Sequence, residues 1–295
     1  MRRFTATGSM RSGRVSHTAT GLPNGRVLVA GGIDGTALAS AELFDPSAGV
    51  FTPAGSLNTA RSDHRATLLA DGKVLIVGGV GPGYSFLAGA ELYDPITGAF
   101  TPTGAMTAPR ESHTLTTLPD GRVLTTGGHR GRHEDIVIYR SVEIYAPATG
   151  RFSGAGNLAV ARHKHDAVLL ADGRVLISGG SDEHDDRGAY ASAEIYDPKT
   201  GTSTLTVRMP GVRYKHAGTS LLLPDGRILI AGGGRNAVIY DPASNRFGAV
   251  PGDLGTAPLS RLFSTATLLR DATALITGGY GQGQSVSAGA WLYRH

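Results

Sequence analysis

Six arginines stand at the same place in a recurring pattern, each at the start of a short segment of alternating polar and apolar residues. They are Arg14, Arg61, Arg110, Arg162, Arg213 and Arg261. A guanidinium group matches a carboxylate or a phosphate with two parallel hydrogen bonds, so a ring of such groups would bind an anion. A second interpretation is that a residue shared by every repeat serves the fold. It would then pair with backbone carbonyls or with the recurring glutamates Glu42, Glu91, Glu143 and Glu194.

Histidines follow these arginines at a spacing of three residues. They are His17, His64, His113, His165 and His216, with Ser264 at the sixth position. Several histidines in one protein suggest a metal site. On a β-strand, however, residues three apart point to opposite faces. We therefore expect the histidines to pack between neighbouring repeats, and we expect neither a metal site nor a cofactor.

The positions that differ between repeats are candidates for a specific site. Polar, mostly basic residues gather in the third to fifth repeats: Glu111, His129, Arg130, His163, Lys164, Tyr214, Lys215 and Arg235. As ligand-binding residues we select Lys164, Lys215, Arg235 and Tyr280 in addition to the six arginines. If the protein is an enzyme, Glu111, His129, His163 and Tyr214 are the residues that could move protons. The plain alternative is a solvated rim of loops.

One loop is strongly acidic. It carries four carboxylates within residues 182–186, which are Asp182, Glu183, Asp185 and Asp186. Carboxylate oxygens are ligands for Ca²⁺, but the spacing lacks the EF-hand pattern. We expect a solvated lid, and calcium binding stays open as the alternative.

The composition limits the class of protein. The chain has 295 residues, a net charge of +4, 6% aromatic residues and no cysteine. The lack of cysteine excludes disulfides and a thiolate nucleophile. The sequence has no Lys/Arg run of five or more residues and few aromatics, which argues against nucleic acid as a partner. No apolar stretch is long enough for a leader or a membrane span, so we expect a soluble, cytoplasmic protein. We also expect a monomer.

A repeat of about 50 residues organises the chain, which is typical of a propeller or a solenoid. Each repeat ends an apolar run with a Gly-Gly pair, first at Gly31-Gly32 and last at Gly278-Gly279. Turn sequences such as Pro119-Asp120-Gly121 separate short β-branched runs, which predicts four antiparallel strands per repeat and almost no helix. The arginine and the Gly-Gly pair lie at the same end of these strands, where the longer loops would carry function.

We predict one all-β domain, a six-bladed β-propeller. The blades are expected at about 11–57, 58–106, 107–158, 159–209, 210–254 and 255–295 plus 1–10. Residues 1–10 supply the missing fourth strand of the last blade, because the run from Phe4 to Met10 matches that from Phe51 to Leu57. Such closure removes two exposed sheet edges.

The repeat resembles the kelch family, in its bacterial, galactose-oxidase-like branch. The segments 110–147 and 213–234 look closest to that branch, and the resemblance covers the whole chain. It implies a propeller but no particular activity. The oxidase chemistry needs a Tyr-Cys crosslink and a tyrosine directly before a histidine ligand. Here cysteine is absent, and Lys215 stands between Tyr214 and His216. The iron-binding pattern of nitrile-specifier proteins, Glu-x3-Asp-x3-His, is also missing, so copper-radical and iron chemistry are not expected.

Two functions remain. The first is a module that binds an anionic small molecule or an acidic peptide at the arginine-lined channel mouth. The second is a metal-free enzyme (an isomerase, epimerase, cyclase or lyase) that acts on an anionic substrate at the same place. A scaffold without a site is the third possibility.

Overall fold

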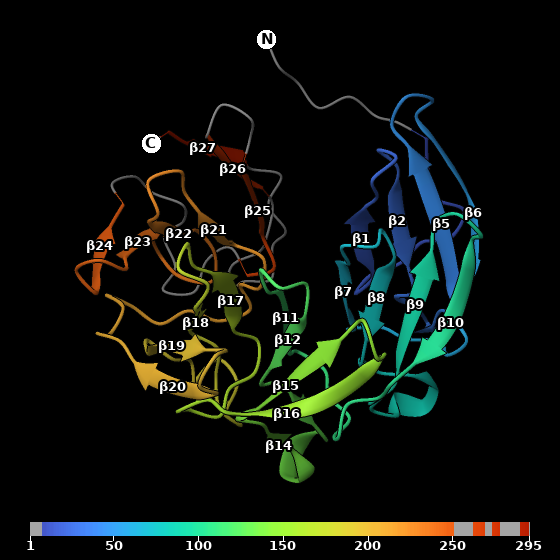
Figure 1. The fold of residues 1–295 in the computed structure, drawn as a ribbon. Helices are drawn as coiled ribbons and strands as arrows, with labels where there is room; N and C mark the ends of the chain where they lie inside the picture. The colour runs from blue at the N-terminus through green and yellow to red at the C-terminus, as the bar shows by residue number, and fades with distance from the viewer. Residues whose placement is uncertain (1–7, 251–261, 269–272, 278–289, 295) are drawn as a thin grey trace. The chain divides into compact units, whose positions relative to one another are not determined.

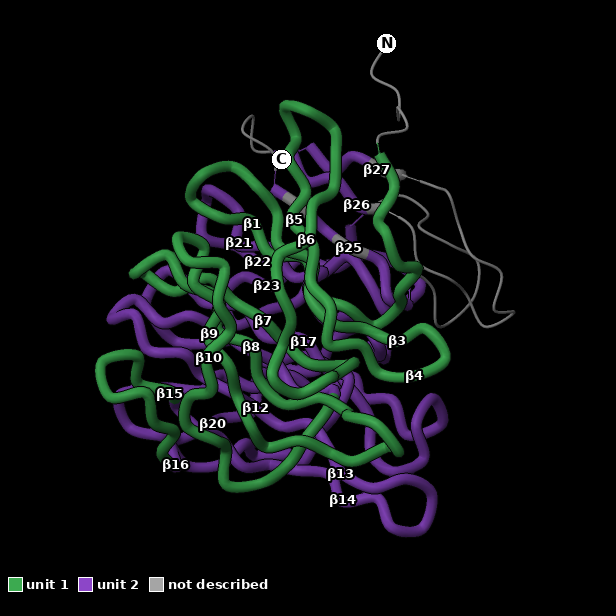
Figure 2. Tube along the Cα trace, turned by 90° about the vertical axis from the view of Figure 1, so that its right-hand side faces the viewer, with its two compact units in different colours: residues 1–111, 145–153 green, residues 112–144, 154–295 purple. Residues whose placement is uncertain are grey.

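The computed structural model describes residues 8–250, 262–268, 273–277 and 290–294. Arg261, Tyr280 and most of the segment 1–10 lie outside these ranges. The chain separates into two compact units, one of residues 1–111 and 145–153 and one of residues 112–144 and 154–295 (Figure 2).

The first unit holds two four-stranded antiparallel sheets (Figure 1). The strands of one are β1 (Thr18–Gly21), β2 (Val27–Ala30), β5 (Ser40–Asp45) and β6 (Val50–Ser56). Those of the other are β7 (Arg65–Leu68), β8 (Val74–Val77), β9 (Ala90–Asp94) and β10 (Ala99–Thr103). A hairpin of β3 (Ile33–Asp34) and β4 (Thr36–Ala37) and a 3-10 turn, η1 (Pro82–Tyr84), lie in the loops after the second strands. The first strands β1 and β7 of the two sheets are neighbours.

The second unit is also built from antiparallel sheets. Its first sheet contains β11 (Thr114–Thr117), β12 (Val123–Thr126), β15 (Ser141–Ala146) and β16 (Arg151–Asn157), the last two shared with the first unit. The next contains β17 (Asp166–Leu169), β18 (Val175–Ser178), β19 (Ala193–Asp197) and β20 (Thr202–Leu205). Another contains β21 (Ser220–Leu222), β22 (Ile228–Ile230), β23 (Val238–Asp241) and β24 (Arg246–Ala249). Described strands of a further sheet are β25 (Thr265–Leu268), β26 (Ala274–Thr277) and β27 (Ala290–Tyr293).

Loop elements of this unit are β13 (His129–Arg130), β14 (Val137–Ile138) and the 3-10 turn η2 (His133–Asp135). The first strands β11, β17, β21 and β25 are successive neighbours. The prediction of an all-β chain built from four-stranded sheets with almost no helix is therefore confirmed over the described ranges. The six-bladed ring and its blade boundaries stay a prediction.

Each strand forms where its sequence pattern indicates. The β-branched run Val74–Val77 is fully buried, as expected for a second strand covered on both faces. The aromatic of the third strand lies directly across from that of the fourth, seven residues on: Tyr93 and Phe100 are partners with ring centroids 4.8 Å apart. Such cross-strand pairs stabilise a sheet. The tight turn at Asp120-Gly121 is possible because Gly121 adopts a φ of +82°, and Asp120 accepts the N–H of Arg122.

The Gly-Gly pair has a packing reason. A Cβ on Gly179 would stand 2.5 Å from the carbonyl oxygen of Arg213 and 2.7 Å from the ring of His216. Both of these residues precede β21, the first strand of the next sheet. The N–H of Gly180 also donates to the Arg213 carbonyl at 2.9 Å. The pair therefore lets successive sheets approach closely, which a side chain would prevent.

Candidate functional site

Three of the recurring arginines are buried and bound within their own sheets. Arg14 reaches Glu42 and Arg61 reaches Glu91, both at 2.9 Å. Arg162 reaches Glu194 at 2.7 Å, and its side chain is fully buried. Each also donates to a backbone carbonyl after the second strand, as Arg61 does to Gly78. Because a buried charge needs such partners, these arginines stabilise the fold. We therefore leave them out of the proposed binding residues.

The other arginines are placed differently. Arg110 is buried in the first unit, and Arg235 is exposed in the loop after β22. Arg213 is buried in the second unit without a carboxylate partner among the described residues. Arg261 is outside the described ranges.

The histidines lie between sheets, which confirms the packing prediction for three of them. The Nε2 of His64 is 2.9 Å from the hydroxyl of Thr18, and that of His165 is 3.0 Å from the hydroxyl of Thr126. His216 reaches the hydroxyl of Ser178 at 3.3 Å. In each case the hydroxyl belongs to the preceding sheet. Burial, followed by the charge of nearby arginines, lowers the pKa of His64 and of His216 to about 3.

The residue two places after each arginine has a left-handed backbone. Its φ is between +52° and +55° at Ser16, Asp63, Ser112, Lys164, Lys215 and Phe263. In the second unit these residues form a backbone chain: Lys164 N–H donates to Ser112, Lys215 N–H to Lys164, and Phe263 N–H to Lys215. Non-glycine residues with this φ are strained, and the surrounding structure must hold them in place. The chain thereby brings the variable side chains of neighbouring repeats together.

Lys164, Lys215 and Tyr214 gather at this chain with Asp185, and we call these four residues the lysine cluster. The ammonium groups of Lys164 and Lys215 lie 5.4 and 4.9 Å from the centre of the Tyr214 ring. Lys164 contacts Asp185 at 2.5 Å and the Tyr214 hydroxyl at 3.2 Å. Tyr214 is buried, whereas the Asp185 side chain is 46% exposed. Although burial raises it, hydrogen bonds from Lys164 and Tyr214 leave the pKa of Asp185 lowered on balance.

His163 and His129 meet beside this cluster. Their Nδ1 atoms are 2.9 Å apart, and His163 Nε2 is 3.1 Å from the Asp182 carbonyl oxygen. A carbonyl only accepts, so His163 Nε2 carries the proton and His163 Nδ1 accepts one from His129. Burial and the nearby charge of Lys164 lower the pKa of His163 to about 3. His163 is therefore neutral, with both of its ring nitrogens engaged.

The structure thus joins Lys164, Lys215, Tyr214, His129 and His163 from the predicted set. Glu111 is a buried residue of the first unit, and Tyr280 lies outside the described ranges. Sequence reasoning did not connect Asp185 or Phe263 with the site. Phe263 occupies the same repeat position as Lys164 and Lys215, so its position in the repeat could have indicated that it lies near them. No feature of the sequence indicates which carboxylate of the acidic loop contacts Lys164.

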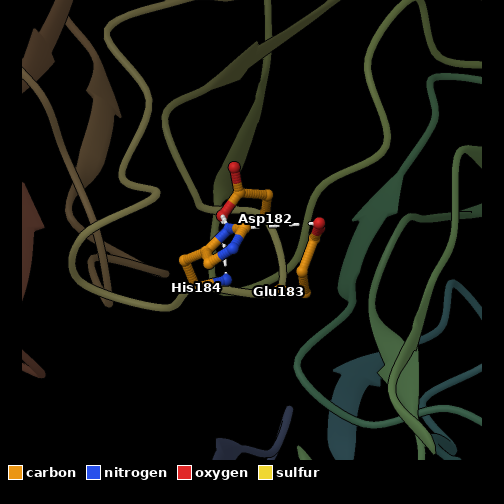
Figure 3. A group of neighbouring side chains, drawn as sticks. All are labelled: Asp182, Glu183 and His184. Atoms are coloured by element: carbon orange, nitrogen blue, oxygen red, sulfur yellow. Dashed lines mark hydrogen bonds and ion pairs between the residues drawn. The ribbon is translucent and has the colours of Figure 1, made fainter. Parts of the chain in front are cut away.

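The acidic loop places Asp182, Glu183 and His184 together (Figure 3). His184 Nδ1 lies 3.2 Å from Asp182 Oδ1 and 3.9 Å from Glu183 Oε1. These ligand atoms lie within 4.8 Å of one another, the one grouping of this kind in the described part of the chain. Glu183 and His184 are exposed, and Asp182 also accepts the N–H of His184 in a local turn. The grouping by itself defines no metal centre.

Comparison with known proteins agrees with this architecture. The Kelch motif family matches residues 14–58. A solved structure described as a novel fungal alcohol oxidase with catalytic diversity among the AA5 family, in complex with copper, superposes with a TM-score of 0.74 at 20% identity. The alignment covers 92% of this chain and 60% of that one, so the chain spans less than two thirds of the oxidase. No curated protein sequence matches this chain significantly.

The chain thus carries a Kelch motif at residues 14–58, and its likeness to the solved structure shows a β-propeller-type fold. His165 and His216 are each buried at a separate contact between neighbouring sheets of the second unit. None of the helices in the described ranges has the length and apolar character that crossing a bilayer requires.

Proposed function

We propose that this kelch-repeat protein binds an anionic small molecule through a carboxylate at the lysine cluster. The observation that carries the proposal is the contact between Lys164 and Asp185. Here the site already holds a carboxylate, supplied by the protein's own loop. A ligand carboxylate that displaces Asp185 would meet Lys164, Lys215 and the Tyr214 hydroxyl. An acidic peptide offers the same group, and it is the alternative ligand.

Charge and geometry support this choice. The cluster has two ammonium groups and one carboxylate, so the displacement of Asp185 leaves two positive charges near one aromatic ring. Charges that converge at a partly buried place attract an anion more strongly than the same charges in bulk solvent. Phe263, 60% exposed and with its ring centre 5.5 Å from the Lys215 ammonium, offers an apolar surface to the rest of the ligand.

The His129–His163 contact favours one second candidate, a metal-free enzyme that transfers protons on the bound anion. The pKa of His163 weighs against it, because a general base works best with a pKa near the operating pH. At about 3 the imidazole is a weak base. Binding without catalysis is therefore the function that we favour, and an isomerase, epimerase, cyclase or lyase activity is the alternative.

A panel of mono- and dicarboxylates and phosphates tests the proposal by calorimetry on the whole chain. We expect at least one carboxylate to bind, and Lys164→Ala with Lys215→Ala to weaken it by about 1.5–3 kcal/mol for each lost charged hydrogen bond. Lys199→Ala, in the exposed turn after β19, is the matched control. The absence of binding by every anion would refute the proposal. Turnover that His163→Ala abolishes while affinity persists would establish the enzyme instead.

A further inference from the structure

Arg213 departs from the pairing that its equivalents make. In the preceding sheet, Arg162 Nε donates to Glu194 Oε1 at 3.0 Å. Glu194 stands opposite Ile177 in its sheet, and the same register places Val238 opposite Ile230 in the sheet of Arg213. A valine therefore occupies the position of the glutamate, while the arginine is retained.

The surroundings of Arg213 only partly compensate its charge. The residue is 3% exposed, and its two terminal nitrogens donate to the carbonyls of Gly232 (at 2.7 Å) and Asn236. Its Nε, one of the two atoms through which Arg162 binds Glu194, has no hydrogen-bond partner among the described residues. Arg14 Nε also lacks one, but Arg14 still pairs with Glu42. A buried cation held by carbonyl dipoles alone is costly, and burial lowers the pKa of Arg213 to about 10.

The repeat of Arg213 also lacks the backbone N–H group that binds the glutamate in other repeats. Glu194 accepts the N–H of Ala159, and Glu91 accepts that of Asn58, in each case the residue three places before the arginine. Before Arg213 that residue is Pro210, which has no N–H. Pro210 and the following Gly211 are exposed, so the place corresponding to the glutamate lies beneath a surface segment.

We propose that Arg213 anchors a second anion site, in which the carboxylate of a small monocarboxylate takes the place that Glu194 takes beside Arg162. The Nε edge of the guanidinium is the recognition element, and the bidentate match of guanidinium and carboxylate sets the preference for formate or acetate over chloride. Among the described residues no carboxylate and no backbone donor takes this place, so in this proposal a ligand supplies the carboxylate. The site does not depend on the lysine cluster.

The substitution Val238→Glu tests the site, because it restores the carboxylate that the other repeats carry. Thermal unfolding is measured in formate, acetate and chloride at one ionic strength. In the wild type we expect formate to raise Tm saturably by about 2–4 °C relative to chloride. Val238→Glu should have the higher Tm in chloride and no response to formate. A wild-type Tm that is the same in all three salts overturns the proposal.

Two further variants separate this site from the alternatives. Arg213→Gln should also lose the formate response, but without the gain in Tm that Val238→Glu shows. The variant with Lys164→Ala and Lys215→Ala should keep the response in full. If that lysine variant loses it instead, formate acts at the lysine cluster and the Arg213 site is refuted. If Val238→Glu fails to fold, titration of Arg213→Gln and wild type with ¹³C-formate by NMR decides, since binding that persists without Arg213 contradicts the site.

Discussion

The Nε2 atom of His165 lies 3.0 Å from the hydroxyl of Thr126, although the two residues belong to neighbouring sheets of the second unit. His165 is fully buried, and its ring also lies against Gly127, where a Cβ would stand 2.7 Å from it. The same relationship joins His64 to Thr18 and His216 to Ser178. The repeated histidine therefore closes the contact between one sheet and the next.

Replacing this histidine should destabilise the protein. His165→Ala leaves a cavity and a buried hydroxyl that has lost a hydrogen-bond partner, so we expect the free energy of unfolding to fall by about 1–3 kcal/mol. Urea unfolding followed by circular dichroism measures it. His184→Ala is the control, because that side chain is 68% exposed. Equal stability of the two variants would count against the packing role.

Stability should depend on pH through the buried histidines. The folded-state pKa values of His64 and His216 are about 3, whereas an unfolded histidine titrates near its ordinary pKa of 6.5. Above pH 6.5 both states are neutral, so the histidines add no pH dependence. As the pH falls from 6.5 toward 3, only the unfolded state takes up protons, and stability declines by about 1.4 kcal/mol per pH unit for each histidine. Urea unfolding of His216→Gln at pH 7.5, 6 and 5 should show a smaller decline than the wild type, and an equal decline would contradict the assignment.

The buried pair of Arg162 and Glu194 should be sensitive to the loss of one partner. Glu194→Gln removes the charge that compensates Arg162 and weakens the bond to the Ala159 N–H. Breaking a buried pair in this way costs about 3–5 kcal/mol. Glu183→Gln, in the exposed acidic loop, should leave the unfolding midpoint unchanged. A Glu194→Gln variant as stable as the wild type would show that the carbonyl contacts of Arg162 suffice.

The N-terminal segment should matter for stability. Residues 1–7 lie outside the described ranges, but Gly8 N–H donates to the Gly49 carbonyl at 2.8 Å, as Gly104 N–H does to Gly150. Arg11 N–H donates to Glu42, as Asn58 N–H does to Glu91. The start of the chain thus makes the contacts that the repeat predicts after a fourth strand. Deleting residues 1–10 should lower Tm in a thermal scan, because the Gly8–Gly49 hydrogen bond and the predicted fourth strand of the last blade are lost; an unchanged Tm would refute the predicted closure.

The sequence by itself determined the pattern of strands and turns within each repeat. Tight turns at positions such as Asp120-Gly121 and alternating burial are local consequences of residue type, so they could be read without a structure. The spacing of Tyr93 and Phe100 likewise follows from one hairpin. The sequence predicted different places for the arginine and the histidine, but the reason it used, alternation along a strand, does not apply. Arg162 and His165 both precede β17, and the left-handed residue Lys164 lies between them.

Only the tertiary structure decided which of the shared residues remain available to a ligand. An arginine followed at a distance by a glutamate can form a ring of binding groups or an internal pair. Arg162 forms the internal pair because the fold brings a terminal nitrogen of its guanidinium to 2.7 Å from the Glu194 carboxylate. The turn of Asp185 toward Lys164 depends in the same way on the path of a loop with no regular pattern. Contacts between segments far apart in sequence are set by packing, and local propensity does not encode them.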